Sequence, residues 1–185
     1  MSEKNMAVFG IYPSYATVES GVDGLKAAGF SNRDISVLFP ESAGTRDFAH
    51  EKGTKAPEGA AAGASTGVIL GGAMGWLVGV GALAIPGLGP FIAAGPIMAA
   101  LAGAGVAGTV LGVAGALVGL GIPEYEAKLY EGRVKDGGIL ISVHSDSSDW
   151  TKRAKLILEA TGAQDIASSS EASSGGVRAE LPRAS

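Results

Sequence analysis

The chain has 185 residues and a net charge of −4 at pH 7, with a pI near 5.2. This length predicts one or two domains, and the acidic balance argues against nucleic-acid binding, which requires a basic face. Cysteine is absent, so disulfides, thiolate metal sites and cysteine nucleophiles are excluded. Glycine accounts for 30 residues, which is about twice its usual share, and this excess needs an explanation.

Residues 1–40 have the pattern of a strand, a helix and a second strand. The segment Ala7–Tyr12 is short and apolar, as in a buried strand, and Asp34–Phe39 has the same character. Between them, apolar residues recur at helical spacing and Gly29 stands where a C-cap is expected. The helical positions are Tyr15, Val18, Val22 and Leu25. No signal peptide is visible, so we expect this half of a soluble domain to be cytoplasmic.

A linker over residues 41–58 leads into a segment without a charged side chain, from Gly59 through Pro123. A helix that is apolar on all sides is either deeply buried or surrounded by lipid. A chain of this size has little material with which to bury two such helices in water. We therefore expect residues 59–122 to form a hydrophobic helical hairpin with the lipid membrane as its partner.

The charge-free segment is long enough for two transmembrane helices, Ala60–Leu83 and Ile97–Leu120. Between them lie the helix breakers Pro86, Gly87, Gly89, Pro90, Gly95 and Pro96. Basic residues flank the outer ends and are absent from the connecting loop, which places both termini on the cytoplasmic side of the inner (cytoplasmic) membrane. The flanking residues are Lys52, Lys55, Lys128, Arg133 and Lys135.

Glycines recur at helical spacing in both expected spans, and we interpret them as helix-packing residues. Small residues at this spacing let helix backbones approach closely. Two interpretations remain open: the glycines relieve crowding within one hairpin, or they also drive assembly of copies into a homo-oligomer. The set comprises Gly59, Gly63, Gly67, Gly71, Gly75 and Gly79 in the first span, and Gly108, Gly112, Gly115 and Gly119 in the second.

Residues 123–167 have the pattern of the second half of the soluble domain. A helix begins at Pro123, the apolar segment Ile139–His144 is a strand, and a further helix ends near Gly162. The short segment Asp165–Ala167 begins a last strand, and residues 168–185 are rich in serine and glycine, as in a disordered tail. The apolar positions of the second helix are Trp150, Ala154, Ile157 and Leu158.

The two soluble halves resemble each other. The segment AAGFSNRDIS at residues 27–36 parallels ATGAQDIAS at residues 160–168, and in each a glycine joins a helix to Asp-Ile. Two βαβ units in succession predict a ferredoxin-like, split βαβ sandwich of the α+β class. In this fold class, the glycine-rich hydrophobic hairpin with its two transmembrane helices interrupts the sandwich between its halves.

Few residues offer catalytic or metal-binding chemistry. His144 is followed by Asp146 and Asp149 after a strand, where a metal or acid–base site could form, but this spacing is not a known metal-ligand pattern. The simpler interpretation is a loop in which Asp149 or Ser148 caps the next helix. His50 lies in a charged linker and is expected to be solvated. We predict no catalytic, cofactor-binding or metal-binding residue, no cofactor, and no enzymatic activity.

Other motifs have simple structural interpretations. The pair Gly71 and Gly72 neither follows a strand nor precedes the Lys-Ser/Thr of a phosphate-binding loop. The alternating charges of residues 124–135 indicate a solvated helix face rather than paired catalytic carboxylates. Three aromatic residues could line a ligand pocket, although core packing or interfacial anchoring is the more common role. They are Tyr125, Tyr130 and Trp150.

Two stretches of the chain resemble a known family. They are TKAPEGAAAGASTG at residues 54–67 and GIPEYEAKLYEGRVKDGGILISVH at residues 121–144. Both are similar to bacterial low-temperature-induced or general-stress proteins with a glycine-zipper hydrophobic segment. The resemblance covers roughly residues 8–166 and implies induction under cold or general stress. It supplies no catalytic or binding residues.

Three functional hypotheses follow. The first is a non-enzymatic, membrane-embedded stress-response protein whose glycine-faced helices pack and self-associate. The second is a small-ligand sensor tethered by the hairpin, whose ligand is unknown. The third is a soluble shell or filament in which copies assemble through their hydrophobic hairpins.

Overall fold

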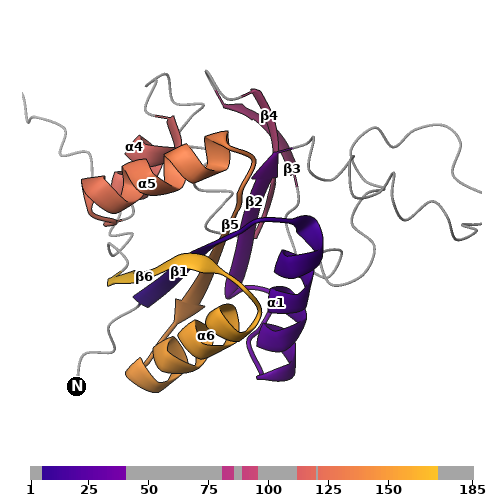
Figure 1. Cartoon of the computed structure of the whole chain (residues 1–185). Coiled ribbons are helices and arrows are strands. Elements are labelled where there is room, and N and C mark those ends of the chain that lie inside the picture. Colours follow the sequence, from indigo (N-terminus) through magenta and orange to yellow (C-terminus); the bar gives the residue numbers. More distant parts are fainter. Residues whose placement is uncertain (1–5, 41–80, 86–88, 96–111, 120, 171–185) are drawn as a thin grey trace, which may run out of the picture.

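The computed structural model describes residues 6–40, 81–85, 89–95, 112–119 and 121–170. These residues form one six-stranded sheet with helices on both of its faces (Figure 1). The linker over residues 41–58, most of the charge-free segment and the end of the expected tail lie outside the described residues.

The N-terminal half consists of β1 (Met6–Tyr12), α1 (Tyr15–Ala27) and β2 (Ile35–Pro40). Ser14 begins α1 with a capping box, because its side chain accepts a hydrogen bond from the Thr17 backbone and the Thr17 hydroxyl accepts one from the Ser14 backbone. The helix buries its apolar positions at the spacing that the sequence predicts. They are Val18, Val22 and Leu25.

The C-terminal half contains β5 (Ile139–Ser145), α6 (Ser148–Ala160) and β6 (Gln164–Ser170). The Ser147 side chain accepts a hydrogen bond from the Trp150 backbone and so caps α6. Strand β6 extends through residues 168–170, which the sequence pattern assigned to the tail.

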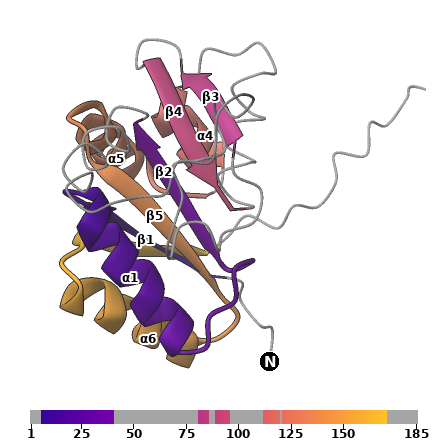
Figure 2. The ribbon, with the colours of Figure 1, turned by 90° about the vertical axis from the view of Figure 1, so that its right-hand side faces the viewer.

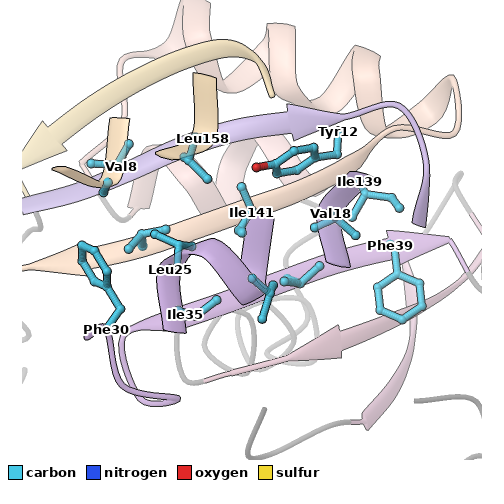
Figure 3. Packing of buried hydrophobic residues seen from close by; sticks show 14 residues of the cluster. Val8, Tyr12, Val18, Leu25, Phe30, Ile35, Phe39, Ile139, Ile141 and Leu158 are labelled. Carbon is cyan, nitrogen blue, oxygen red and sulfur yellow. The ribbon is translucent and has the colours of Figure 1, made fainter. Parts of the chain in front are cut away.

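The strand order is β3-β4-β2-β5-β1-β6, so β5 lies between β1 and β2 and pairs antiparallel with both. Strands β1 and β2 therefore run parallel to each other without touching, which is the split βαβ arrangement. Helices α1 and α6 cover one face of this sheet. Their apolar residues, including Leu158 of α6, pack against alternate residues of β1, β2 and β5, including Val8 and Ile141 (Figure 3).

A second helical layer covers the opposite face. It consists of α4 (Gly112–Gly119) and α5 (Glu124–Lys135), which lie side by side across the sheet from α1 and α6 (Figure 1). The buried residues between this layer and the sheet form a second core. They are Ala7, Phe9, Ile11, Leu38, Phe91, Val113, Leu117, Ile122, Ala127, Tyr130, Val134 and Leu140.

The predicted fold class is wrong where it inserts two transmembrane helices. Each helix among the described residues is too short or too polar to cross a bilayer. Residues 81–83, expected at the end of the first span, belong to β3 (Gly81–Ile85), and the expected turn contains β4 (Gly89–Ala94). Figure 2 shows β4 beside β2 and β3 beside β4, where the two strands extend the sheet.

The second expected span is also interrupted. Its described part is α4, which has 8 residues. Gly112 has a φ of 59°, a left-handed conformation that a continuous right-handed helix does not contain. The prediction of a transmembrane helix is therefore wrong for this part of the segment, where Val113 and Leu117 of the short helix α4 pack into the second core.

Candidate functional site

Helix α5 is amphipathic and presents one face to the sheet and one to solvent. Its buried residues Ala127, Tyr130 and Val134 are three or four positions apart, so they lie on one side of the helix. Acidic residues occupy its first turn and basic residues its last turn, which favours the helix because each charge complements the nearer end of the helix dipole.

Glu131 links α5 to the start of α4. The Ala114 N–H donates a hydrogen bond to Glu131 Oε2 over 2.8 Å, and the Lys135 ammonium donates one to Oε1 over 2.6 Å. Both hydrogen bonds hold the pKa of Glu131 below its ordinary value, and the hydrogen bond from Lys135 has the larger effect. Glu131 therefore acts as an N-terminal cap supplied by the neighbouring helix.

Replacing Glu131 with glutamine should lower the free energy of unfolding by about 1 kcal/mol at neutral pH. Because the folded-state pKa lies below the unfolded-state value, this stabilisation is complete above the unfolded-state pKa and is lost as the pH falls through the folded-state pKa. Urea unfolding of wild type and variant across this range measures the effect. Glu159→Gln removes an equal charge from the exposed end of α6, and a pH dependence equal to that of Glu131→Gln would contradict the assignment.

Helix α5 also holds the first residues of β6. The Tyr130 hydroxyl donates a hydrogen bond to the Asp165 carbonyl over 2.8 Å, and Arg133 Nε donates one to Asp165 Oδ2 over 2.8 Å. Asp165 has a φ of 51°, which is unfavourable for a residue with a side chain. Burial raises the pKa of Tyr130, and the negative charges of Glu126 and Asp165 raise it further. The phenol therefore stays protonated and acts as a donor.

The solvent-facing side of α5 carries large apolar side chains. Tyr125 is 80% exposed and Leu129 is 36% exposed. Gly132 follows three residues later, and a Cβ at this position would have no neighbour within 4 Å in the described part of the chain. These three residues lie on one stripe of the helix, opposite the buried stripe. We call them the outer face of α5.

The predicted helix-packing glycines are only partly described. Seven of them lie outside the described residues, namely Gly59, Gly63, Gly67, Gly71, Gly75, Gly79 and Gly108. The other three belong to α4. A Cβ at Gly112 would lie 3.0 Å from Glu131 Oε2, so this glycine permits the close contact of α4 with α5. Gly115 is half-buried and Gly119 is exposed.

His144 lies near the end of β5, where its Nε2 is 2.8 Å from Asp146 Oδ1. Asp149 lies in the first turn of α6, although the residue that caps this helix is Ser147 rather than Ser148 or Asp149. Among the described residues, no group of three metal-ligating side chains could hold a metal ion.

Two serines on neighbouring strands give the second core a polar spot. Ser36 on β2 and Ser142 on β5 are register partners, and both are completely buried. Within the described part of the chain, the Ser142 hydroxyl has no hydrogen-bond partner. A serine nucleophile requires a hydrogen bond to a general base, so Ser142 is not arranged as one.

The aromatic residues that the sequence singled out have different environments. Tyr130 is a core residue, with its ring centroid 6.1 Å from that of Phe9. Trp150 packs edge-on against Phe30, with the two ring centroids 4.8 Å apart. The Arg153 guanidinium lies 5.0 Å from the centroid of the Trp150 ring. Only Tyr125 among these three is largely exposed, at the solvent side of the second layer.

Comparison with known proteins found no matching family model, no matching curated protein and no matching solved structure.

Neither the cap that Glu131 supplies nor the exposure of Tyr125 was predicted from the sequence. Glu131 lies in an alternating charge pattern that usually indicates a solvated face, and its contact with Ala114 spans two helices. A signal for Tyr125 was available, because Ala127, Tyr130 and Val134 define the buried stripe and Tyr125 falls opposite it.

Proposed function

We propose that this chain is a non-enzymatic stress-response protein that acts by self-association, and that the outer face of α5 is its contact surface. The resemblance to low-temperature-induced and general-stress proteins suggests the physiological setting. The observation that carries the self-association is the exposed apolar stripe of Tyr125 and Leu129 beside the open position at Gly132.

Exposure of a large aromatic residue supports a contact surface. Tyrosine is enriched in protein–protein interfaces, where it supplies a rigid apolar area. Gly132 adds a second argument, because a glycine within a helix costs about 1 kcal/mol relative to alanine. Close approach of another backbone would offset this cost, and Gly132 adjoins Leu129 on the same stripe.

Truncation of Tyr125 tests this function. In detergent-free buffer, the full chain should show concentration-dependent association in sedimentation velocity, and Tyr125→Ala should weaken it by at least about tenfold, since interface tyrosines often dominate binding. Leu156→Ala is the matched control, because Leu156 is 65% exposed on α6 in the other helical layer and should leave association unchanged. A wild-type chain that stays monomeric up to about 100 µM, where weak interfaces still form, would overturn the proposal.

A second candidate function is the binding of a small polar ligand in the second core. It is favoured by the buried Ser142 hydroxyl, which has no partner among the described residues and lies beside Ser36, because such a hydroxyl gains free energy from any hydrogen bond it acquires. A thermal-shift screen with amino acids, nucleotides and metal ions tests this candidate. A ligand that raises the melting temperature of wild type but not of Ser142→Ala would support it.

A further inference from the structure

The charges of α5 form an inverted pattern about the middle of the helix. Each acidic residue has a basic residue at the same distance on the other side of the midpoint, which lies between Leu129 and Tyr130. The three matched pairs are Glu124 with Lys135, Glu126 with Arg133, and Glu131 with Lys128.

This pattern makes α5 complementary to a reversed copy of itself. A two-fold axis places the same surface of both copies in contact, so an antiparallel pair sets each residue opposite the one equally far from the midpoint. Glu124 and Glu126 of one helix then face Lys135 and Arg133 of the other, whereas Glu131 remains the cap of α4. A parallel pair would instead set each charge opposite its own copy, which is unfavourable.

In two of the matched pairs, the two members also lie on the same flank of the helix. At about 100° per residue, Glu124 and Lys135 are separated by about 20° around the axis, and so are Glu126 and Arg133. Residues on the same flank meet in an antiparallel pair with two-fold symmetry. Side chains of opposite charge can therefore reach each other on both sides of the apolar stripe.

The apolar stripe agrees with the same register. Leu129 lies next to the midpoint, so the two copies of Leu129 meet at the two-fold axis. Tyr125 comes within about one helical turn of Gly132 of the second copy, and the position of the missing Cβ is open to receive its ring.

We propose that two copies of this chain pair through antiparallel α5 helices, with Leu129 at the two-fold axis and Glu124 of each copy beside Lys135 of the other. This arrangement rests on the proposed self-association and specifies its geometry. The side chains of Glu124 and Lys135 are accessible for it, with exposures of 71% and 50%. Their present partners, Lys128 and Glu131, lie within the same helix.

Charge exchange between two variants tests the arrangement. Glu124→Lys and Lys135→Glu should each weaken self-association about tenfold, because each places like charges opposite each other twice in the pair. An equimolar mixture of the two full-length variants should recover association to within about threefold of wild type, since both cross-contacts then join opposite charges. Local effects of each substitution on folding are present in the mixture too, so they cannot produce the recovery.

Single cysteine substitutions test the antiparallel arrangement of the two helices directly, because the chain has no cysteine of its own. Under mild oxidation, Leu129→Cys should form a disulfide between copies. Tyr125→Cys should not, since its two copies lie about 13 Å apart along the helices and a disulfide needs Cα atoms within about 7 Å. Parallel pairing would crosslink both variants.

The outcomes separate the two proposals. If wild type associates but the mixture binds no better than either variant alone, or if Tyr125→Cys crosslinks as readily as Leu129→Cys, the antiparallel arrangement is overturned while self-association stands. If wild type does not associate at all, both proposals fail.

Discussion

Replacing Leu117 with alanine should lower the free energy of unfolding by about 3 kcal/mol. Leu117 lies on α4, within the charge-free segment, and is completely buried in the second core. The substitution removes buried apolar surface and leaves a cavity between α4 and the sheet, while alanine preserves the helix propensity. Urea unfolding followed by far-ultraviolet circular dichroism measures the loss.

The adjacent residue provides a matched control. Val118 is 43% exposed on the same helix, so Val118→Ala should change the free energy of unfolding by less than about 0.5 kcal/mol. If the two variants unfold at the same urea concentration, α4 does not belong to the folded core. This comparison tests the placement of the charge-free segment against the sheet.

Gly95→Ala should destabilise the attachment of β4 to β2 by about 3 kcal/mol. Gly95 has a φ of 94°, and a Cβ there would overlap the carbonyl oxygen of Ile35 and lie 2.7 Å from Ser36 Cα. These are backbone atoms within the sheet, so they cannot move aside without breaking strand pairing. Hydrogen exchange of the β2 and β4 amides, together with urea unfolding, measures the change.

Gly137→Ala distinguishes the cost of a left-handed backbone from the cost of steric overlap with a neighbouring strand. Gly137 has a φ of 93°, but a Cβ there has no neighbour within 4 Å among the described residues. This variant should therefore show only the cost of a left-handed conformation, about 1 kcal/mol. Equal losses for Gly95→Ala and Gly137→Ala would show that the close approach of Gly95 to β2 does not exist in solution.

The elements of the two βαβ halves could be predicted because their signals are local. The spacing of Val18, Val22 and Leu25 indicates a helix wherever it packs, and Gly29 and Gly162 both adopt the positive φ that ends a helix and starts a turn. The observed bounds of these strands and helices differ from the expected ones by a few residues at most.

The second helical layer has a signal in the sequence. Strands β1 and β5 are buried at consecutive positions rather than at alternate ones, and the sequences AVFGIY and ILISV already have this character. A strand that is apolar on both sides must be covered on both faces. The expected sandwich covered only one face, so the sheet itself required an apolar segment such as α4.

The contacts that make up the candidate surface depend on tertiary structure. Whether Glu131 is solvated or caps another helix is decided by the position of Ala114, which lies 17 residues away in the chain. By contrast, the inverted charge pattern of α5 is visible in the sequence alone. Its meaning emerges only when the structure shows that Tyr125 and Leu129 are left on the solvent side.

The position of β5 between β1 and β2 has a consequence for how this protein matures. The first strand and the second share no edge, so a nascent chain that has emerged only as far as residue 40 cannot build any part of the sheet. Strand β2 can pair with β4 once residues 89–94 have been made, but β1 has no partner until β5 is synthesised more than a hundred residues later, and such distant pairings slow folding. An N-terminal fragment that ends before Ile139 should therefore leave β1 detached from the other strands, because only the central strand β5 joins β1 to β2.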